Sequence, residues 1–456
     1  MVNIAQTKRV LAFVCLLISN FMYGAMAPNT VVGVVNTGVN PAGIGISPNN
    51  NFAYVANNNS LGITGQNSVS VVDLTNNLPA QTITDPSFNQ PFTVTPNAQG
   101  TIAYVTNSGG STISMIDMAT NSVVGTISGF DGPSGMVIAP SGNTAYVNNY
   151  GLNGNGNTIR QVDLTTNTVV GASITVGTAP SSIALSPNGQ FLYTTNYVNG
   201  NPGTGTMSVI RTSDNSVAAT VPGFSGPFAM AITPNGNYAY VANYGSNSTN
   251  AFGSTVSVVD LRSNVIVDTI NVGIQPSGIA VTPDGRYVYV SNYNSLSTGS
   301  SSPSGQGTVN IIDAATNQVI APTIPVGQSP SNITISPNGE YAYVSNYGSN
   351  TISAIALQSF QIVGKGCKMK DKKSKRVTNK LTWKVSGSSL PVSYSIYRDA
   401  ALMDLAGTVP ATSKLEFFDR NVNPKIEYTY YIVGVNEDQI ASDPVAVPVT
   451  KKCKKK

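Results

Sequence analysis

The chain has 456 residues, more than one ordinary domain needs; 10% of them are charged and 41% are apolar. This balance excludes an intrinsically disordered chain, which combines high net charge with low hydrophobicity. Histidine is absent, which excludes a Ser-His-Asp triad, a histidine-ligated zinc or copper site and a histidine-ligated haem.

The net charge of +4 is divided unevenly along the chain. Residues 28–364 hold four arginines against eleven acidic residues and carry −7, whereas residues 365–456 hold eighteen cations against nine acids and carry +9. Such an asymmetry predicts a domain boundary near Gly364 and different partners for the two parts.

Residues 1–27 have the pattern of a secretory signal peptide: Lys8-Arg9, an apolar run over 10–21, and Ala25-Met26-Ala27. The apolar run is too short for a good membrane span. Pro28 suits signal peptidase poorly, so the cleavage position, and an uncleaved anchor, stay open. We expect an extracytoplasmic protein (secreted, periplasmic or at the cell surface) with no transmembrane span in the mature chain.

The middle of the chain repeats a Tyr-x-x-Asn core seven times at spacings of 42 to 54 residues. The copies are Tyr54–Asn57, Tyr104–Asn107, Tyr146–Asn149, Tyr193–Asn196, Tyr240–Asn243, Tyr289–Asn292 and Tyr343–Asn346. Short β-runs recurring with a period of about 40–50 residues are typical of propeller blades. The sequence therefore predicts an all-β fold, a seven-bladed β-propeller over 29–364.

Each unit predicts four strands, which in the sixth are Gly278–Thr282, Tyr287–Asn292, Thr308–Asp313 and Gln318–Pro325. Pro-Asp-Gly and related turns join the first two strands of the units. Residues 29–38 resemble a fourth strand and could complete the last blade, which would remove its open edge. Gln358–Gly364 could serve as that strand instead.

The core Tyr-Val-Thr-Asn at 104–107, preceded by a Pro-Asn turn and followed by a strand ending in Ile-Asp, resembles the YVTN β-propeller repeat. That family occurs in exported and surface-layer proteins of bacteria and archaea. The resemblance implies a fold and a location, but not a chemistry, because propellers host many unrelated functions.

Residues 377–450 differ from the repeats and predict a small β-sandwich between a basic linker, 365–376, and a basic tail, 451–456. An early tryptophan and a late Tyr-x-Tyr-x-x-Val are similar to a fibronectin type III module. The resemblance implies that Trp383 is the core tryptophan and Tyr428 the tyrosine corner.

Two cysteines remain once a signal peptide is removed, Cys367 and Cys453, and they flank the second module. In an oxidising compartment we expect them to form a disulfide that joins its two ends. Closing so long a loop contributes up to about 4–5 kcal/mol by chain entropy.

The seven repeated asparagines are interpreted as structural, because every unit has one. Five units place an aromatic directly after the asparagine, where the second-to-third-strand loop begins. A ring of tyrosines there could bind sugars or a peptide, and the alternative is packing between blades. These candidate binding residues are Tyr150, Tyr197, Tyr244, Tyr293 and Tyr347.

Asp85 and Asp131 lie outside the repeat pattern, in connections between blades. They are the best candidates for a carboxylate pair or a calcium site, although eleven acids over seven blades are sparse for a calcium-dependent hydrolase. We expect no metal and no cofactor.

Twelve cations surround the two cysteines and form a predicted basic anchor patch. Such a patch attracts anionic surfaces, and the alternative is a solvated linker and tail. The patch consists of Lys365, Lys368, Lys370, Lys372, Lys373, Lys375, Arg376, Lys451, Lys452, Lys454, Lys455 and Lys456. No motif for sequence-specific nucleic-acid binding is present.

These features predict a binding protein rather than an enzyme. The propeller loop face would hold a protein or glycan, and the second module would act as spacer or anchor, its lysines on an anionic cell surface. Two alternatives stay open: an exported lactonase- or lyase-like enzyme that uses carboxylates, and a structural surface-layer component.

Overall fold

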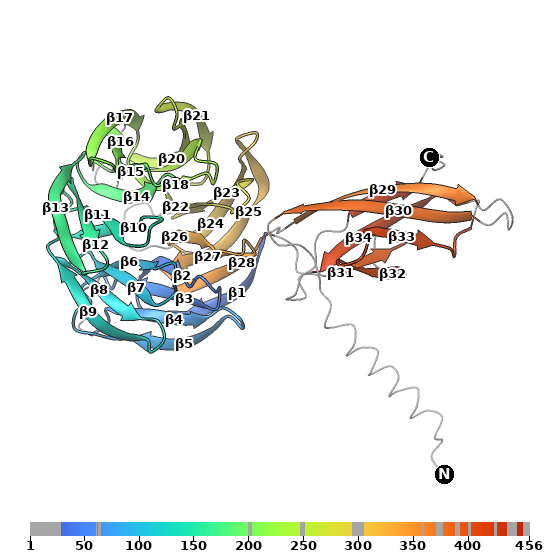
Figure 1. The fold of residues 1–456 in the computed structure, drawn as a ribbon, viewed down its shortest axis with the longest axis horizontal. Helices are drawn as coiled ribbons and strands as arrows, with labels where there is room; N and C mark the ends of the chain where they lie inside the picture. Colours follow the sequence, from blue (N-terminus) through green and yellow to red (C-terminus); the bar gives the residue numbers. More distant parts are fainter. Residues whose placement is uncertain are drawn as a thin grey trace, which may run out of the picture. The chain divides into compact units, whose positions relative to one another are not determined.

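The computed structural model describes residues 29–60, 62, 65–198, 203–246, 251–293, 305–357, 360–370, 377–387, 393–399, 403–423, 426–435 and 445–449. It divides into two compact units, Val31–Leu357 and a second unit that includes Gln358–Lys456. The described residues form strands and turns only. The predicted all-β class, a seven-bladed propeller followed by a small β-sandwich, is confirmed (Figure 1).

Seven four-stranded antiparallel sheets make the blades of the propeller. Blade one is β2 (Pro41–Ile46), β3 (Phe52–Asn57), β4 (Ser68–Asp73) and β5 (Leu78–Ile83). Blade two is β6 (Pro91–Pro96), β7 (Ile102–Asn107), β8 (Thr112–Asp117) and β9 (Ser122–Ser128). Blade three is β10 (Pro133–Ile138), β11 (Thr144–Asn149), β12 (Thr158–Asp163) and β13 (Thr168–Thr175).

Blade four is β14 (Pro180–Leu185), β15 (Phe191–Asn196), β16 (Gly205–Arg211) and β17 (Ser216–Phe224). Blade five is β18 (Pro227–Ile232), β19 (Tyr238–Ser246), β20 (Ala251–Asp260) and β21 (Val265–Asn271). Blade six is β22 (Pro276–Val281), β23 (Tyr287–Asn292), β24 (Gln306–Asp313) and β25 (Gln318–Gln328). Blade seven is β26 (Pro330–Ile335), β27 (Tyr341–Asn346), β28 (Thr351–Ala356) and β1 (Thr30–Asn36).

The repeated Tyr-x-x-Asn core occupies the second strand of each blade. Its tyrosine packs between neighbouring blades; the Tyr54 hydroxyl, for example, donates to Asn121 Oδ1 of blade two at 2.7 Å. Its asparagine donates from Nδ2 to a hydroxyl of the third strand in every blade, as Asn346 does to Thr351 and Ser353. Both repeated positions are therefore structural.

Serines of the first strands join consecutive blades around the central channel. The hydroxyls of Ser134, Ser181, Ser277 and Ser331 each donate to the carbonyl of the proline that begins the first strand of the next blade. Ser331 reaches Pro41 in this way and so joins blade seven to blade one. The sequence repeat thus encodes the bonds between blades as well as the blades themselves.

The ring is closed by the N-terminal strand, since β1 lies next to β28 in blade seven (Figure 1). The other candidate, Gln358–Gly364, does not close it. Instead β29 (Phe360–Lys370) pairs over its whole length with β30 (Val377–Gly387). The propeller unit therefore ends at Leu357 rather than near Gly364, and the predicted linker 365–376 begins as a strand of the second unit.

The second unit is a sandwich of a three-stranded and a four-stranded sheet. The first contains β29, β30 and β33 (Glu416–Asp419); the second contains β32 (Leu405–Pro410), β31 (Ser393–Tyr397), β34 (Tyr428–Val435) and β35 (Val445–Val449). Its core holds Trp383 edge-to-face against Tyr394, with centroids 5.3 Å apart. The Tyr428 hydroxyl accepts a hydrogen bond from the Asn423 N–H, five residues upstream.

A buried polar network lies at one edge of this core. Arg398 Nε donates to Asp419 Oδ2 at 2.7 Å, and the Tyr430 hydroxyl donates to the same oxygen. Burial alone would raise the pKa of Asp419, but the hydrogen bonds from Arg398, Tyr430 and the Asn421 N–H outweigh it and lower that pKa. The ionised carboxylate is therefore the stabilised form.

Replacing Val35 should test the closure of the ring by β1. Val35 is 2% exposed and packs against blades seven and one, whereas its neighbour Val34 is 62% exposed. We expect Val35→Ala to lower the free energy of unfolding of the propeller by about 2 kcal/mol. Val34→Ala, the matched control, should change it by less than about 0.5 kcal/mol. Equal effects in denaturant titrations followed by circular dichroism would contradict the assignment of β1.

Replacing Asp419 should destabilise the sandwich selectively. Trp383 is the single tryptophan, so its fluorescence reports this unit in the full chain. We expect Asp419→Asn to cost about 2–3 kcal/mol. Asp404→Asn, which removes the exposed partner of Arg398, should cost less than about 1 kcal/mol.

The same carboxylate should make the stability of the sandwich depend on pH. Its pKa is lower in the folded state, so it stabilises the fold above its unfolded pKa of about 4. That contribution is lost as the pH falls through the folded pKa. Asp419→Asn should weaken this acid dependence of the Trp383 transition, while Glu416, whose pKa Lys380 and Lys414 also lower, keeps a part of it. An unchanged acid profile would contradict the prediction.

Candidate functional site

The residue after each repeated asparagine stands at one mouth of the propeller channel. Its backbone N–H donates to the carbonyl of the residue that precedes the first proline of the same blade. That preceding residue has a positive φ in all seven blades, at Asn40, Gln90, Gly132, Ala179, Gly226, Gln275 and Ser329. Because the turn recurs in every blade, it belongs to the scaffold and gives the seven residues equivalent positions.

Five of these seven positions hold tyrosine, as the sequence predicts, and the structure brings four of them into a continuous chain of ring contacts. Tyr197 meets Tyr244 at 6.4 Å, Tyr244 meets Tyr293 at 6.1 Å, and Tyr293 meets Tyr347 at 6.4 Å. Tyr150 packs against the same cluster. The tyrosines of blades three to seven thus form a crescent, which Asn58 and Ser108 interrupt in blades one and two.

The packing interpretation applies to two of the tyrosines, and binding stays a prediction for the other three. Tyr197 and Tyr244 are 6% and 8% exposed and belong to a buried cluster with Ala179, so they pack between blades. Tyr150, Tyr293 and Tyr347 are half-buried and can contact a ligand. The buried pair therefore supports the three tyrosines that face the mouth.

Two phenylalanines complete the mouth, and the sequence prediction missed them. Phe92 and Phe228 follow the first proline of blades two and five, where four other blades have serine and blade one has Ala42. Phe228 contacts Tyr244 at 5.4 Å and Tyr197 at 5.9 Å. Alignment of the seven repeats on this proline would reveal both as departures from the pattern.

These side chains line a cavity of about 350 Å³. The cavity walls include all five tyrosines, both phenylalanines, Asn58, Ser277 and Ser331. A second cavity of about 180 Å³ shares Phe92, Phe228, Ser277 and Ser331 with it and is lined by first-strand residues of all the blades. The mouth therefore leads into the central channel.

The phenols of the mouth are neutral at physiological pH, as a tyrosine ordinarily is, and burial shifts their pKa further upward. Burial raises the pKa of Tyr150, Tyr293 and Tyr347, and it raises the pKa of Tyr197 to about 12, with a smaller contribution from Tyr150. The Tyr347 hydroxyl is hydrogen-bonded to Ser60. At neutral pH the crescent offers rings and hydroxyl groups but no charge.

Asp85 and Asp131 bind backbone groups of their own or the adjacent turn. Asp85 Oδ1 accepts the Ser87 N–H at 2.8 Å, and Asp131 Oδ1 accepts the Leu152 N–H at 3.3 Å. Within the described ranges, no three Cys, Asp or Glu side chains group as metal ligands. The described part of the chain also contains no helix that is long and apolar enough to cross a membrane.

The predicted basic patch lies only partly within the described residues. Lys365 is exposed on β29, Lys368 Nζ donates to the Ile426 carbonyl at 3.4 Å, and Lys370 ends the strand. Cys367 is disulfide-bonded. Its predicted partner Cys453, like Lys372, Lys373, Lys375, Arg376, Lys451, Lys452, Lys454, Lys455 and Lys456, lies outside the described residues.

Comparisons with known proteins support the propeller fold. The family described as "Lactonase, 7-bladed beta-propeller" matches residues 203–359. A solved chain of the Kuenenia stuttgartiensis hydrazine synthase superposes with a TM-score of 0.58 and 20% identity, over 74% of this chain and 99% of that one. This likeness concerns the fold alone.

A curated relative matches over a short stretch. The PE-PGRS family protein PE_PGRS18 of Mycobacterium tuberculosis (strain ATCC 25618 / H37Rv) is 51% identical over 59 residues. The match spans 13% of this chain and 13% of that protein.

Replacing the two phenylalanines should separate their roles. Phe228 makes two ring contacts, whereas no described ring contact involves Phe92. We expect Phe228→Leu to destabilise the propeller by about 1–2 kcal/mol, and Phe92→Leu by less than about 1 kcal/mol. Denaturant unfolding followed by circular dichroism checks this. A larger loss for Phe92→Leu would contradict the packing role of Phe228.

Proposed function

We propose that the chain is an exported or cell-surface binding protein whose channel mouth holds a partner. The observation that carries the proposal is the aromatic cavity. Five tyrosines and two phenylalanines converge there, although they come from six different blades. Concave, mostly apolar cavities with a few polar groups are typical of binding sites.

The proposal includes the family resemblances and the export signal. The Tyr-x-x-Asn repeats support membership of the YVTN type of propeller, and residues 1–27 support export. The buried Trp383, and the bond from the Asn423 N–H to Tyr428, which has the form of a tyrosine corner, support a fibronectin type III-like sandwich.

We place a disulfide between Cys367 and Cys453 within this proposal. At Gly366, a Cβ atom would lie 2.5 Å from the Val449 side chain and 3.0 Å from the Pro448 carbonyl oxygen. The residue before Cys367 is thus close to the end of β35, four residues before Cys453. The pairing would gather the lysines near both cysteines at one end of the sandwich, as an anchor on an anionic surface.

A lactonase-like enzyme is the second candidate, favoured by the family match at 203–359. The positions of the acids weigh against it. Of the six acids in that region, Asp268 lies within the outer strand β21. The other five lie in, or end the strand before, hairpin turns between first and second or third and fourth strands: Asp214, Asp260, Asp284, Asp313 and Glu340. In antiparallel blades those turns are on the face opposite the tyrosines. Hydrolysis of a δ-lactone that is lost in Asp85→Asn or Asp131→Asn would favour the enzyme.

The binding function is tested with the labelled full-length mature protein on intact cells and envelope fractions, over a salt series. We expect Phe92→Ser, which installs the residue that four other blades have there, to reduce retention at high salt. Replacing Lys451, Lys452, Lys454, Lys455 and Lys456 by glutamine should reduce retention only at low salt, because salt screens exposed charges.

Retention that is unaffected by Phe92→Ser at every salt concentration would contradict a role for the mouth. Retention that is unaffected by the glutamine variant at low salt would contradict the anchor. Since Phe92 is half-buried and has no described ring contact, Phe92→Ser should lower the thermal midpoint only slightly, and a cooperative unfolding transition serves as the control for folding.

A further inference from the structure

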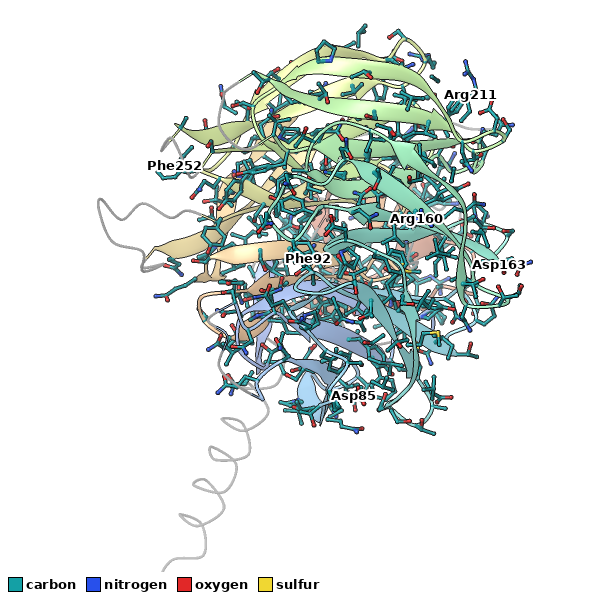
Figure 2. The ribbon with its side chains drawn as sticks, turned by 90° about the vertical axis from the view of Figure 1, so that its left-hand side faces the viewer. Asp85, Phe92, Arg160, Asp163, Arg211 and Phe252 are labelled. Atoms are coloured by element: carbon teal, nitrogen blue, oxygen red, sulfur yellow. The ribbon has the colours of Figure 1, made fainter. Side chains whose placement is uncertain are left out.

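Charged side chains are distributed unequally between the two faces of the propeller. Eight of its eleven acids lie in the hairpin turns opposite the mouth or end the strands that lead into them: Asp73, Asp117, Asp163, Asp214, Asp260, Asp284, Asp313 and Glu340. Of its four arginines, Arg211, Arg262 and Arg286 lie in or beside the same turns, and Arg160 lies within β12, outside the lining of the cavity. Figure 2 shows Asp163 and Arg211 on one side of the propeller and Phe252, from the hairpin of blade five, on the other.

The mouth face has almost no charge by comparison. Its connections carry only two ionisable acids, Asp85 and Asp131, and each accepts a backbone N–H. The propeller residues outside the described ranges, 61, 63–64, 199–202, 247–250 and 294–304, contain no Asp, Glu, Lys or Arg in their sequence. Serine, threonine, asparagine and glycine dominate them.

This lack of charge restricts the class of ligand. A carboxylate, phosphate or ammonium group that entered the cavity would lose its hydration without gaining a counter-charge, which is costly. The crescent itself is neutral at physiological pH, because a tyrosine phenol titrates near 10 even in water. Burial raises the pKa of its phenols further. Acidic glycans, nucleic acids and strongly charged protein surfaces are therefore disfavoured at this site.

The remaining groups match a sugar chain. Half-buried aromatic rings from Tyr150, Tyr293 and Tyr347 offer apolar surface next to hydroxyl groups. Asn58 interrupts the crescent with an amide, and Ser277 and Ser331 line the wall with hydroxyl groups. A sugar ring has one face of C–H groups and a rim of hydroxyls, so it can use both kinds of surface at once. The volume of about 350 Å³ is sufficient for a small ligand or the end of a chain.

We propose that the channel mouth binds an uncharged glycan, with the half-buried tyrosines and Phe92 against the sugar rings. The inference rests on the proposed binding function and names the ligand class for the same site. The exposed Phe252, on the extended β19–β20 hairpin, adds a further aromatic group to this face.

Titration calorimetry of the full mature chain with soluble polysaccharides tests the ligand class. The neutral probes are mannan, laminarin and amylose, the acidic probes are alginate and hyaluronan, and decaproline represents an uncharged peptide. We expect at least one neutral polysaccharide to bind and the acidic ones not to bind. Binding of only acidic polysaccharides, or of decaproline alone, would overturn the proposal.

Variants locate the binding. Tyr293→Ala should weaken binding of the neutral polysaccharide by about tenfold, and Phe92→Ser should weaken it as well. Tyr287→Ala, the same change on the opposite face, should leave it unchanged; Tyr287 lies next to Arg286. If Tyr293→Ala unfolds the propeller, the binding affinity of Phe92→Ser alone decides whether the mouth is the site. Equal binding by Phe92→Ser and the wild type would overturn the site.

Treatment of envelope fractions separates this proposal from the general binding function. Periodate cleaves the vicinal diols of sugars, and a 1,3-glucanase hydrolyses the 1,3-linked glucans that lack such diols. The two treatments together should abolish retention that depends on Phe92, whereas protease treatment should not. Retention that depends on Phe92, resists periodate and glucanase together and is lost after protease would overturn the glycan and keep the binding function. Absence of any retention dependent on Phe92 would overturn both.

Discussion

The propeller depends on the buried asparagine that ends the second strand of every blade. Its amide donates to hydroxyls of the third strand, which fixes where the two strands separate. In four blades a glycine packs directly on this amide, and a Cβ at Gly327 would lie 2.5 Å from Asn346 Cγ. The amide thus sets the end of one strand and the path of the connection beside it. The direction of the residue that follows, at the channel mouth, is a result of that contact.

This arrangement separates the residues that hold the fold from those that can vary. The backbone at the mouth is fixed by the asparagine and by the positive-φ turn before each proline, so the side chains at two positions per blade are free to differ. One position holds tyrosine in five blades, and Asn58 and Ser108 in the others. The other holds serine in four blades, Ala42 in one, and Phe92 and Phe228 in two. The mouth can therefore change its chemistry without a change of fold, which fits a scaffold for recognition.

The fold was predictable because its determinants are local and repeated. Seven Tyr-x-x-Asn cores with turn residues between short β-runs define the blades, and Trp383 with the late tyrosines indicates the sandwich. The choice of closing strand was not predictable from the sequence, because Thr30–Asn36 and Gln358–Gly364 both have β character. The structure decides between them, since the second segment pairs with β30 and the first lies next to β28. The tyrosines of the site followed from the repeat, but Phe92 and Phe228 did not. The role of these two phenylalanines appears only when equivalent first strands are compared around the ring. No periodic pattern in the sequence separates the buried Tyr197 and Tyr244 from the three half-buried tyrosines.

Closure by β1 has a consequence for how the chain reaches its folded state. Asn40 and Asn350 are 310 residues apart in the sequence, and the Asn40 N–H donates to Asn350 Oδ1 across the closing junction. When the chain is synthesised, starting at its N-terminus, β1 therefore appears first, as an unpaired edge. Its partner β28 is the last strand of the propeller to appear. Contacts of such sequence separation form slowly, since the loop-closure entropy is paid before they do. Until then six complete blades can stack while the seventh lacks its outer strand. Pairing of β1 with β28 is thus a long-range step, and until it occurs β28 keeps an open edge that can pair with other chains.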